Sequence, residues 1–174
     1  MQLSALPPIH WLRVPQADSL NQVLGERFSA LKDDSATGKT HFFHGRFENL
    51  YIGKAQLPEI APLVELAESL AQQRLGVRQA LRSGYWFNAM GPGHVTSRHS
   101  HEEIDELLSA VYYVQVPKDS GDLILHAEPA VVRITPEPGL MVLFPPDLEH
   151  EVTENLSDRQ RLSIAFNFGP TEEG

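Results

Sequence analysis

The stretch SAVYYVQVPKDSGDLILH, at residues 109–126, decides the fold class. Two runs rich in β-branched and aromatic residues, Ser109 to Val116 and Asp122 to His126, flank a turn of Pro, Asp, Ser and Gly. This pattern is typical of two strands with a short connection. Similar runs of β-branched and aromatic residues, separated by turn-forming residues, continue on both sides of this stretch. It predicts further strands over Tyr85 to Met90, Val95 to Ser100, Val131 to Thr135, Leu140 to Phe144, Glu149 to Val152 and Arg161 to Phe168.

The first 80 residues have a helical pattern instead. Apolar residues recur at helical spacing over Asp18 to Leu31 and over Glu59 to Leu75, which predicts two amphipathic helices. Between them, His41 to Ile52 has the composition of a strand. Eight short strands after two helices predict a mainly β fold, a double-stranded β-helix (jelly roll, cupin-like), with the helices outside one sheet. We expect one domain over 1–174, with 1–80 as a helical support region and 84–168 as the β-helix core.

The composition narrows the classes of partner and metal. The 174 residues include no cysteine, so any metal must be held by His and carboxylate side chains. A formal net charge of -9 argues against a broad surface for nucleic acid or anionic membrane. No apolar run approaches the roughly 20 residues of a membrane span, and the first residues do not resemble a signal peptide. We therefore expect a cytoplasmic protein whose partner is a small molecule or a protein, with a homodimer left open.

Three histidines form a candidate metal site. His99 and His101 are two residues apart, so on a strand both side chains project from the same face. His150 lies on another predicted strand, which antiparallel pairing can bring beside the first two. Imidazole nitrogens suit iron, zinc, copper and nickel, and three protein ligands leave coordination positions open. The remaining histidines, His10, His41, His44, His94 and His126, are assigned no role.

A carboxylate alternative exists within the same motif. Glu103 follows His101 at the spacing of the His-x-Glu pair that many oxygenases use, so Glu103 can replace His99 as a ligand. We favour His99 with His101, because the acidic run from Glu102 to Glu106 is more typical of a solvated loop than of a continued strand.

Arg161 and Ser163 form a candidate anion clamp. They lie on one face of a predicted strand, and the turn-forming residues 154–158 predict a hairpin that returns this strand beside His150. A guanidinium with an adjacent hydroxyl binds a carboxylate through charge-assisted hydrogen bonds.

An ordered set of motifs over residues 84–168 resembles the 2-oxoglutarate- and Fe(II)-dependent oxygenases, particularly their bacterial and phage members. The motifs are Trp86-Phe87-Asn88, His99-Ser100-His101, Ser109-Ala110-Val111-Tyr112-Tyr113, Ser120-Gly121-Asp122-Leu123, Gly139 to Pro145, His150-Glu151-Val152 and Arg161 to Asn167.

The resemblance implies both a site and a reaction. Fe(II) would be held by His99, His101 and His150, and the co-substrate 2-oxoglutarate would place its distal carboxylate on Arg161. Ser163 and Tyr113 would assist at that carboxylate. The implied reaction is hydroxylation of a small molecule or a protein side chain, with release of succinate and CO2.

Two other interpretations remain open. A cupin would use His99, His101, Glu106 and His150 as metal ligands without 2-oxoglutarate. Against it, Tyr113 falls where the cupin motif has glycine, Pro136 to Gly139 is out of register, and Arg161 receives no role. The third interpretation is a metal-free barrel that serves as a binding domain. The joint presence of three histidines and Arg161 argues against it.

Overall fold

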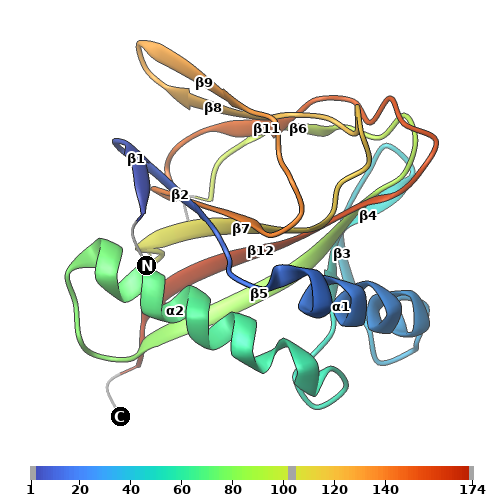
Figure 1. Cartoon of the computed structure of the whole chain (residues 1–174), viewed down its shortest axis with the longest axis horizontal. Helices are drawn as coiled ribbons and strands as arrows, with labels where there is room; N and C mark the ends of the chain where they lie inside the picture. The colour runs from blue at the N-terminus through green and yellow to red at the C-terminus, as the bar shows by residue number, and fades with distance from the viewer. Residues whose placement is uncertain (1–2, 102–104, 173–174) are drawn as a thin grey trace.

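The strands form two antiparallel sheets in the computed structural model, which describes residues 3–101 and 105–172 (Figure 1). The larger sheet has the order β1 (Ser4–Leu6), β2 (Ile9–Arg13), β10 (Leu140–Phe144), β7 (Leu108–Gln115), β12 (Arg161–Pro170), β5 (Leu81–Met90), β4 (Arg46–Tyr51) and β3 (Gly38–Phe43). The smaller sheet has the order β6 (Thr96–His99), β11 (His150–Val152), β8 (Leu123–Ala127) and β9 (Ala130–Ile134). The predicted mainly β, double-stranded β-helix fold is confirmed.

Strand β12 shows how the alternating sequence divides the larger sheet into two faces. Successive side chains of a strand point to opposite faces. One set, Leu162, Ile164, Phe166 and Phe168, is buried in the core beneath the helices. The other set, Arg161, Ser163, Ala165 and Asn167, lines a cavity on the opposite face. The polar residues of this strand therefore face the inside of the sandwich.

The two predicted helices cover the outer face of the larger sheet (Figure 1). Helix α1 (Ala17–Leu31) buries Phe28, whose ring stacks on Phe87 of β5 with centroids 5.1 Å apart. Helix α2 (Ala61–Leu75) follows a single 3-10 turn, Pro58–Ile60, and ends at Gly76, whose φ of 70° suits a left-handed cap. No helix within the described ranges is long and apolar enough to cross a membrane.

A second, smaller core lies between the two sheets. It joins Val142 and Phe144 of β10 to Leu123 and Leu125 of β8, with Tyr113 of β7 beside them. Tyr113, Leu123 and Phe144 also line the cavity, which extends from this core to β6 and β11.

The N-terminal region differs from the sequence prediction in two places. Strands β1 and β2 precede the first helix, so this region is not purely helical, and β2 pairs with the distant β10. The single strand expected over His41 to Ile52 is a hairpin of β3 and β4, which turns at His44 and Gly45 with positive φ angles of 51° and 79°. Tertiary pairing creates these strands, and it leaves little local signal in the sequence.

Candidate metal centre and co-substrate pocket

His99 and His150 lie opposite each other on paired strands of the smaller sheet. Strand β11 runs antiparallel to β6 with His150 in register with His99, and their ring centroids are 4.3 Å apart. The expectation that antiparallel pairing joins these distant residues is confirmed. The pairing fixes the backbone positions of both rings before any metal is added.

His101 reaches the same place by a different route. Strand β6 ends at His99, so the pleat of a continuous strand does not position His101. Its backbone N–H instead donates to the carbonyl oxygen of Pro146 at 2.8 Å, which ties it to the turn before β11. Its ring centroid lies 5.1 Å from that of His99 and 5.0 Å from that of His150. The three rings converge as the sequence predicts, through a loop contact rather than a strand.

The three imidazoles have the chemistry of a metal-binding set. One ring nitrogen from each lies within 4.8 Å of the others. The Nδ1 atoms of His99 and His150 lie 2.7 and 3.0 Å from the carbonyl oxygens of Ser97 and Leu148. A carbonyl only accepts hydrogen bonds, so Nδ1 of each ring carries the proton and Nε2 keeps its lone pair for a metal ion.

Burial keeps two of these rings in the neutral form that a metal requires. Burial, together with the neighbouring His99 and His41, lowers the pKa of His101 to about 4. Burial and the neighbouring His99 lower the pKa of His150 to about 3, against the opposing effect of the Leu148 carbonyl. Both side chains are therefore uncharged, with one ring nitrogen free to bind a metal, near neutral pH.

The sequence offered Glu103 and Glu106 as alternative metal ligands, and the structure bears on only one of them. Glu103 lies outside the described residues. Glu106 is not part of the group of three histidines, and its carboxylate pairs with Arg82 at 3.3 Å. The four-residue cupin site that includes Glu106 is therefore not formed in this structure.

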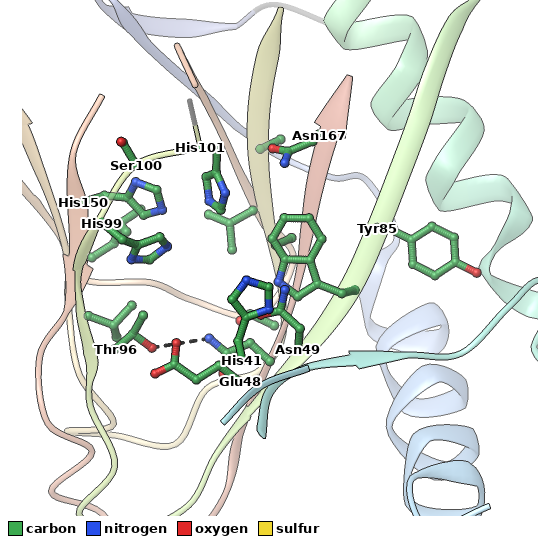
Figure 2. A pocket seen from close by; sticks show the side chains of 18 of the residues that line it. His41, Glu48, Asn49, Tyr85, Thr96, His99, Ser100, His101, His150 and Asn167 are labelled. Atoms are coloured by element: carbon green, nitrogen blue, oxygen red, sulfur yellow. Dashed lines mark hydrogen bonds between the residues drawn. The ribbon is translucent and has the colours of Figure 1, made fainter. Parts of the chain in front are cut away.

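Figure 2 shows the three histidines on one wall of a cavity of about 850 Å³. Arg161, Ser163 and Tyr113 line the same cavity from the larger sheet, so all six predicted site residues share one space. The predicted hairpin between β11 and β12 is wrong, because β11 pairs with β6 and β8 whereas β12 pairs with β5 and β7. The connection crosses between the sheets, and Arg161 faces the histidine wall across the interior.

Arg161 is a buried cation without an acidic partner among residues 3–101 and 105–172. Only 1% of it is exposed, and its Nη1 donates to the carbonyl oxygen of Gly121 at 2.8 Å. Its Cζ lies 5.0 Å from the centroid of the Tyr113 ring. Its Nε and the hydroxyl of Tyr113 have no hydrogen-bond partner within the described parts of the chain. A buried charge with free donors is costly unless an anion binds it, so this end of the cavity fits a carboxylate.

Gly121 is required where the chain passes Arg161. Its φ of 104° lies in the region that favours glycine, and a Cβ at this position would clash with the carbonyl oxygen of Thr153. The absence of a side chain lets the Gly121 carbonyl approach the guanidinium. The sequence motif Ser120-Gly121-Asp122-Leu123 thus has a direct structural role beside the anion-binding end.

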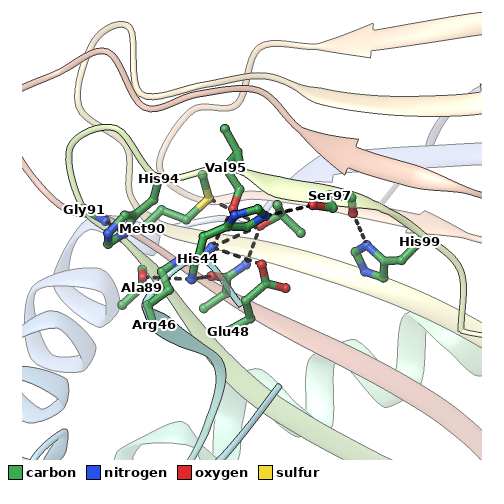
Figure 3. A network of polar contacts seen from close by, with 12 residues as sticks. His44, Arg46, Glu48, Ala89, Met90, Gly91, His94, Val95, Ser97 and His99 are labelled. Atoms are coloured by element: carbon green, nitrogen blue, oxygen red, sulfur yellow. Dashed lines mark hydrogen bonds and ion pairs between the residues drawn. The ribbon is translucent and has the colours of Figure 1, made fainter. Parts of the chain in front are cut away.

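A polar network connects the β3–β4 hairpin to the segment Val95 to His99, which includes strand β6 (Figure 3). The guanidinium of Arg46 donates to the side chain of Asn88 at 2.9 Å and to the carbonyl oxygen of Val95 at 3.1 Å. His44 Nε2 lies 3.4 Å from the hydroxyl of Ser97, whose carbonyl oxygen contacts His99. The hairpin is thereby connected to a metal-ligand candidate.

Several cavity residues were assigned no site role from the sequence. His41, Glu48 and Asn49 of the hairpin line the cavity together with Asn167 of β12 (Figure 2). His41 is one of the histidines to which the sequence assigns no role, because a lone histidine carries no spacing signal. Glu48 and Asn49 lie on a strand whose pairing partners are defined only by the tertiary structure.

Three convergent histidines that could hold a metal ion face a buried arginine inside a double-stranded β-helix, an arrangement that fits a metal-dependent oxygenase with a carboxylate co-substrate. The family model described as "Putative 2OG-Fe(II) oxygenase" matches residues 84–132 and 125–167. The chain belongs to the 2-oxoglutarate- and Fe(II)-dependent oxygenase superfamily.

Solved structures of similar fold include a prolyl-4-hydroxylase from Pseudomonas putida, with a TM-score of 0.73 and 20% identity over 92% of each chain. A prolyl hydroxylase from Trichoplax adhaerens, in complex with a hypoxia inducible factor peptide, has a TM-score of 0.71 and 17% identity over 92% of this chain and 83% of that one. The carbocyclase SnoK from nogalamycin biosynthesis has a TM-score of 0.74 and 14% identity over 93% and 79%. No curated protein sequence matches this chain.

Proposed function

We propose that this protein is an Fe(II)- and 2-oxoglutarate-dependent dioxygenase that hydroxylates a small molecule or the side chain of a polypeptide. The observation that carries the assignment is the buried guanidinium of Arg161, which shares a cavity with three convergent imidazoles and has no acidic partner within the described chain. A single ligand that coordinates a metal through one end and carries a carboxylate at the other would fit both the three histidines and Arg161.

Each site residue has a defined task in this proposal. His99, His101 and His150 would hold the iron through Nε2, because Nδ1 of His99 and of His150 is engaged by a backbone carbonyl. Arg161 would bind the distal carboxylate of 2-oxoglutarate, assisted by the hydroxyls of Tyr113 and Ser163, which line the same end. Ser163 lies opposite Tyr113 on the neighbouring strand β7, so both hydroxyls belong to one region.

Fe(II) and 2-oxoglutarate, with O2 as the oxidant, would supply the chemistry: oxidative decarboxylation to succinate and CO2, which takes up one oxygen atom, coupled to hydroxylation of a substrate C–H bond by the other. The protein provides orientation and a partly enclosed space. Trp86 and Phe144 form apolar parts of the cavity wall next to the histidine rings, with ring centroids 5.5 Å from His101 and 4.9 Å from His150. These aromatic side chains would shield part of the proposed metal site from solvent.

The similar structures support both classes of substrate. Two are prolyl hydroxylases, one in complex with a peptide, and a third is a carbocyclase of a biosynthetic pathway. The hairpin beside the cavity exposes three aromatic side chains, Phe42, Phe43 and Phe47, at 61%, 51% and 41% of their surface. Such a concentration of exposed aromatic surface is typical of a binding site and supports an extended substrate.

The test is anaerobic loading with Fe(II), measurement of bound iron, and assay of succinate release from 2-oxoglutarate after oxygen is admitted. We expect about one iron per chain and slow succinate release without added substrate. Bound metal with no 2-oxoglutarate binding would support a cupin-type protein, and no bound metal would support a binding domain.

A further inference from the structure

Strand β6 carries His99 at the edge of the smaller sheet. It has four residues, and within the described ranges it pairs with one strand only, β11. The register of this pair is irregular between His150 and Val152. Strand β11, by contrast, lies between β6 and β8. A short edge strand with one irregular ladder has few backbone hydrogen bonds to hold it, so the position of His99 depends on contacts with other elements.

Arg46, the first residue of β4, links the beginning of β6 to the larger sheet (Figure 3). Its Nη2 donates to the carbonyl oxygen of Val95 at 3.1 Å and to Oγ1 of Thr96 at 3.3 Å. Its Nη1 donates to the side chain of Asn88 at 2.9 Å and to the carbonyl oxygen of Ala89 at 3.2 Å, both on β5. One nitrogen of the guanidinium therefore binds the start of β6, and the other binds β5.

The guanidinium of Arg46 is enclosed at this place rather than exposed to solvent. Only 9% of its side chain is exposed, and the carboxylate of Glu48, 3.7 Å away, balances its charge. Its hydrogen bonds use the planar fork of a guanidinium, which the single ammonium of a lysine does not reproduce. Arg46 is not among the residues that line the cavity, so any effect on the metal site passes through the protein.

The contact between Arg46 and Thr96 lies next to the group that orients His99. Nδ1 of His99 donates to the carbonyl oxygen of Ser97 at 2.7 Å, and Ser97 directly follows Thr96. The direction of the His99 Nε2 lone pair therefore depends on the peptide backbone at Ser97. Thr96 is itself 5% exposed, so a displacement there is not absorbed by solvent. Arg46 acts on His99 through this segment.

The other two imidazoles are positioned without Arg46. Nδ1 of His150 donates to the carbonyl oxygen of Leu148 at 3.0 Å, and the backbone of His101 donates to Pro146 at 2.8 Å. Both partners lie in the turn between β10 and β11. A change at Arg46 should therefore reach one of the three rings and leave the other two in place.

We propose that Arg46 is a positioning residue of the metal centre, which fixes the imidazole of His99 by linking β6 to β5. The inference rests on the proposed function only because it takes His99 as a metal ligand. Partners that orient a ligand are part of a metal site even when they do not touch the ion. The role is specific, since it applies to His99 and not to His150.

The first test observes the histidine rings of the metal-free full chain at about pH 8.5, where ordinary imidazoles are neutral. Long-range ¹H–¹⁵N correlation spectra of protein labelled with ¹⁵N-histidine distinguish the Nδ1–H from the Nε2–H tautomer, and His99→Ala and His150→Ala assign the signals. We expect both rings of the wild type in the Nδ1–H form. In Arg46→Met, His99 should become a mixture of tautomers, whereas His150 should keep one.

The second test is a Co(II) titration followed by visible absorption, which reports the geometry of the ligands. Arg46→Met should weaken Co(II) binding by about tenfold, the lower end for loss of an outer partner, and should change the absorption of the bound ion. Thr96→Val removes one acceptor of Arg46 but leaves both Arg46 and Glu48 in place. It should change His99 and the Co(II) spectrum in the same direction and to a smaller extent, even if Arg46→Met does not fold.

Arg27→Met is the matched control for the loss of a partly buried arginine. Arg27 lies on helix α1 and donates to the carbonyl oxygen of Gln56 at 2.7 Å, outside the cavity. Its variant should keep the wild-type tautomers and Co(II) spectrum. Urea denaturation of each variant measures the accompanying change in the free energy of unfolding.

Four results would overturn the inference: a wild-type His99 without one fixed tautomer, an unchanged His99 in Thr96→Val and in folded Arg46→Met, equal changes at His99 and His150, or the same change in Arg27→Met. The tautomer measurement requires neither metal nor turnover. A selective change at His99 in a protein that releases no succinate would contradict the proposed function alone. Succinate release by the wild type, with His99 unchanged in the variants, would contradict the positioning role alone.

Discussion

His150 lies directly opposite His99 across the antiparallel pair of β11 and β6, with 4.3 Å between their ring centroids. Strand register therefore positions two of the proposed metal ligands, and a shift of one residue would turn one ring to the outer face of the sheet. The loop contact between His101 and Pro146 then adds the third ring to a pair that is already fixed.

Removal of one of the three imidazoles should greatly weaken metal binding. We expect His150→Ala and His99→Ala each to lower Fe(II) affinity by more than about 100-fold, since loss of an outer partner alone costs 10–100-fold. Bound iron is measured after gel filtration under anaerobic conditions. His126→Ala is the control, because His126 lies on the adjacent strand β8 and outside the group of three. Glu103→Ala should retain iron; if it loses iron and His99→Ala retains it, the ligand assignment is wrong.

Replacement of Arg161 should separate co-substrate binding from metal binding. Arg161→Ala removes the charged donor for the distal carboxylate, at a cost of about 2–5 kcal/mol in 2-oxoglutarate binding. Iron retention should persist, because Arg161 lies on the opposite sheet from the histidines. Calorimetric titration with 2-oxoglutarate under anaerobic conditions measures the effect. Arg159→Ala, an exposed position just before β12, should bind normally. Unchanged affinity in Arg161→Ala would remove the basis of the clamp.

The close approach of Gly121 to Thr153 should make even alanine unfavourable. Gly121→Ala adds a methyl group against a backbone carbonyl at a positive φ, so we expect a loss of more than about 1 kcal/mol in the free energy of unfolding and weaker 2-oxoglutarate binding. Gly53→Ala is the control, since its added Cβ would meet no atom within 4 Å and its φ is not positive. Urea denaturation of both variants measures the change in the free energy of unfolding. An equal change at the two positions would contradict this explanation of Gly121.

The buried hydroxyl of Tyr112 should contribute a pH-dependent part of the stability. It donates to Asn21 of α1 at 2.6 Å, and burial raises the pKa of Tyr112 to about 12. In the unfolded chain the phenol ionises near pH 10, so this contribution is complete below pH 10 and is lost as the pH rises towards 12.

The Tyr112→Phe variant provides the comparison. It leaves the Asn21 oxygen without its donor and should lower the free energy of unfolding at pH 7 by about 1–3 kcal/mol. The difference from wild type should shrink between pH 10 and 12, as followed by urea denaturation. A constant difference over that range would show that ionisation of Tyr112 is not coupled to unfolding.

Local sequence patterns predicted most of the β-helix core and all three histidines. Strand β10 was predicted with its observed ends, and the other core strands differ by a few residues at their ends. These elements are short runs of apolar, β-branched and aromatic residues bounded by clear turns. The convergence of the three histidines could be predicted because His99 and His101 form a spaced pair and His150 follows a turn; their role as metal ligands stays a prediction.

The features that were predicted wrongly, or not at all, depend on contacts between segments distant in the sequence. The path from β11 to β12 looked like a hairpin, because turn-forming residues join two strands, but a turn does not specify whether the chain changes sheets. Asn155 fixes this path, since its side-chain amide donates to the carbonyl oxygens of Met90 and Arg159. Arg46 likewise acts through residues more than 40 positions away. Neither arrangement has a local pattern in the sequence.

The division of the site between the two sheets has a mechanical consequence. His99 and His150 are on strands of the smaller sheet, whereas Arg161 is on a strand of the larger one. A single 2-oxoglutarate molecule, bound at one end by the iron and at the other by Arg161, would connect the two sheets across the interior. Bound 2-oxoglutarate should then reduce motion of the smaller sheet relative to the larger one. Each turnover converts 2-oxoglutarate to the shorter succinate, which would weaken this connection and favour release of succinate.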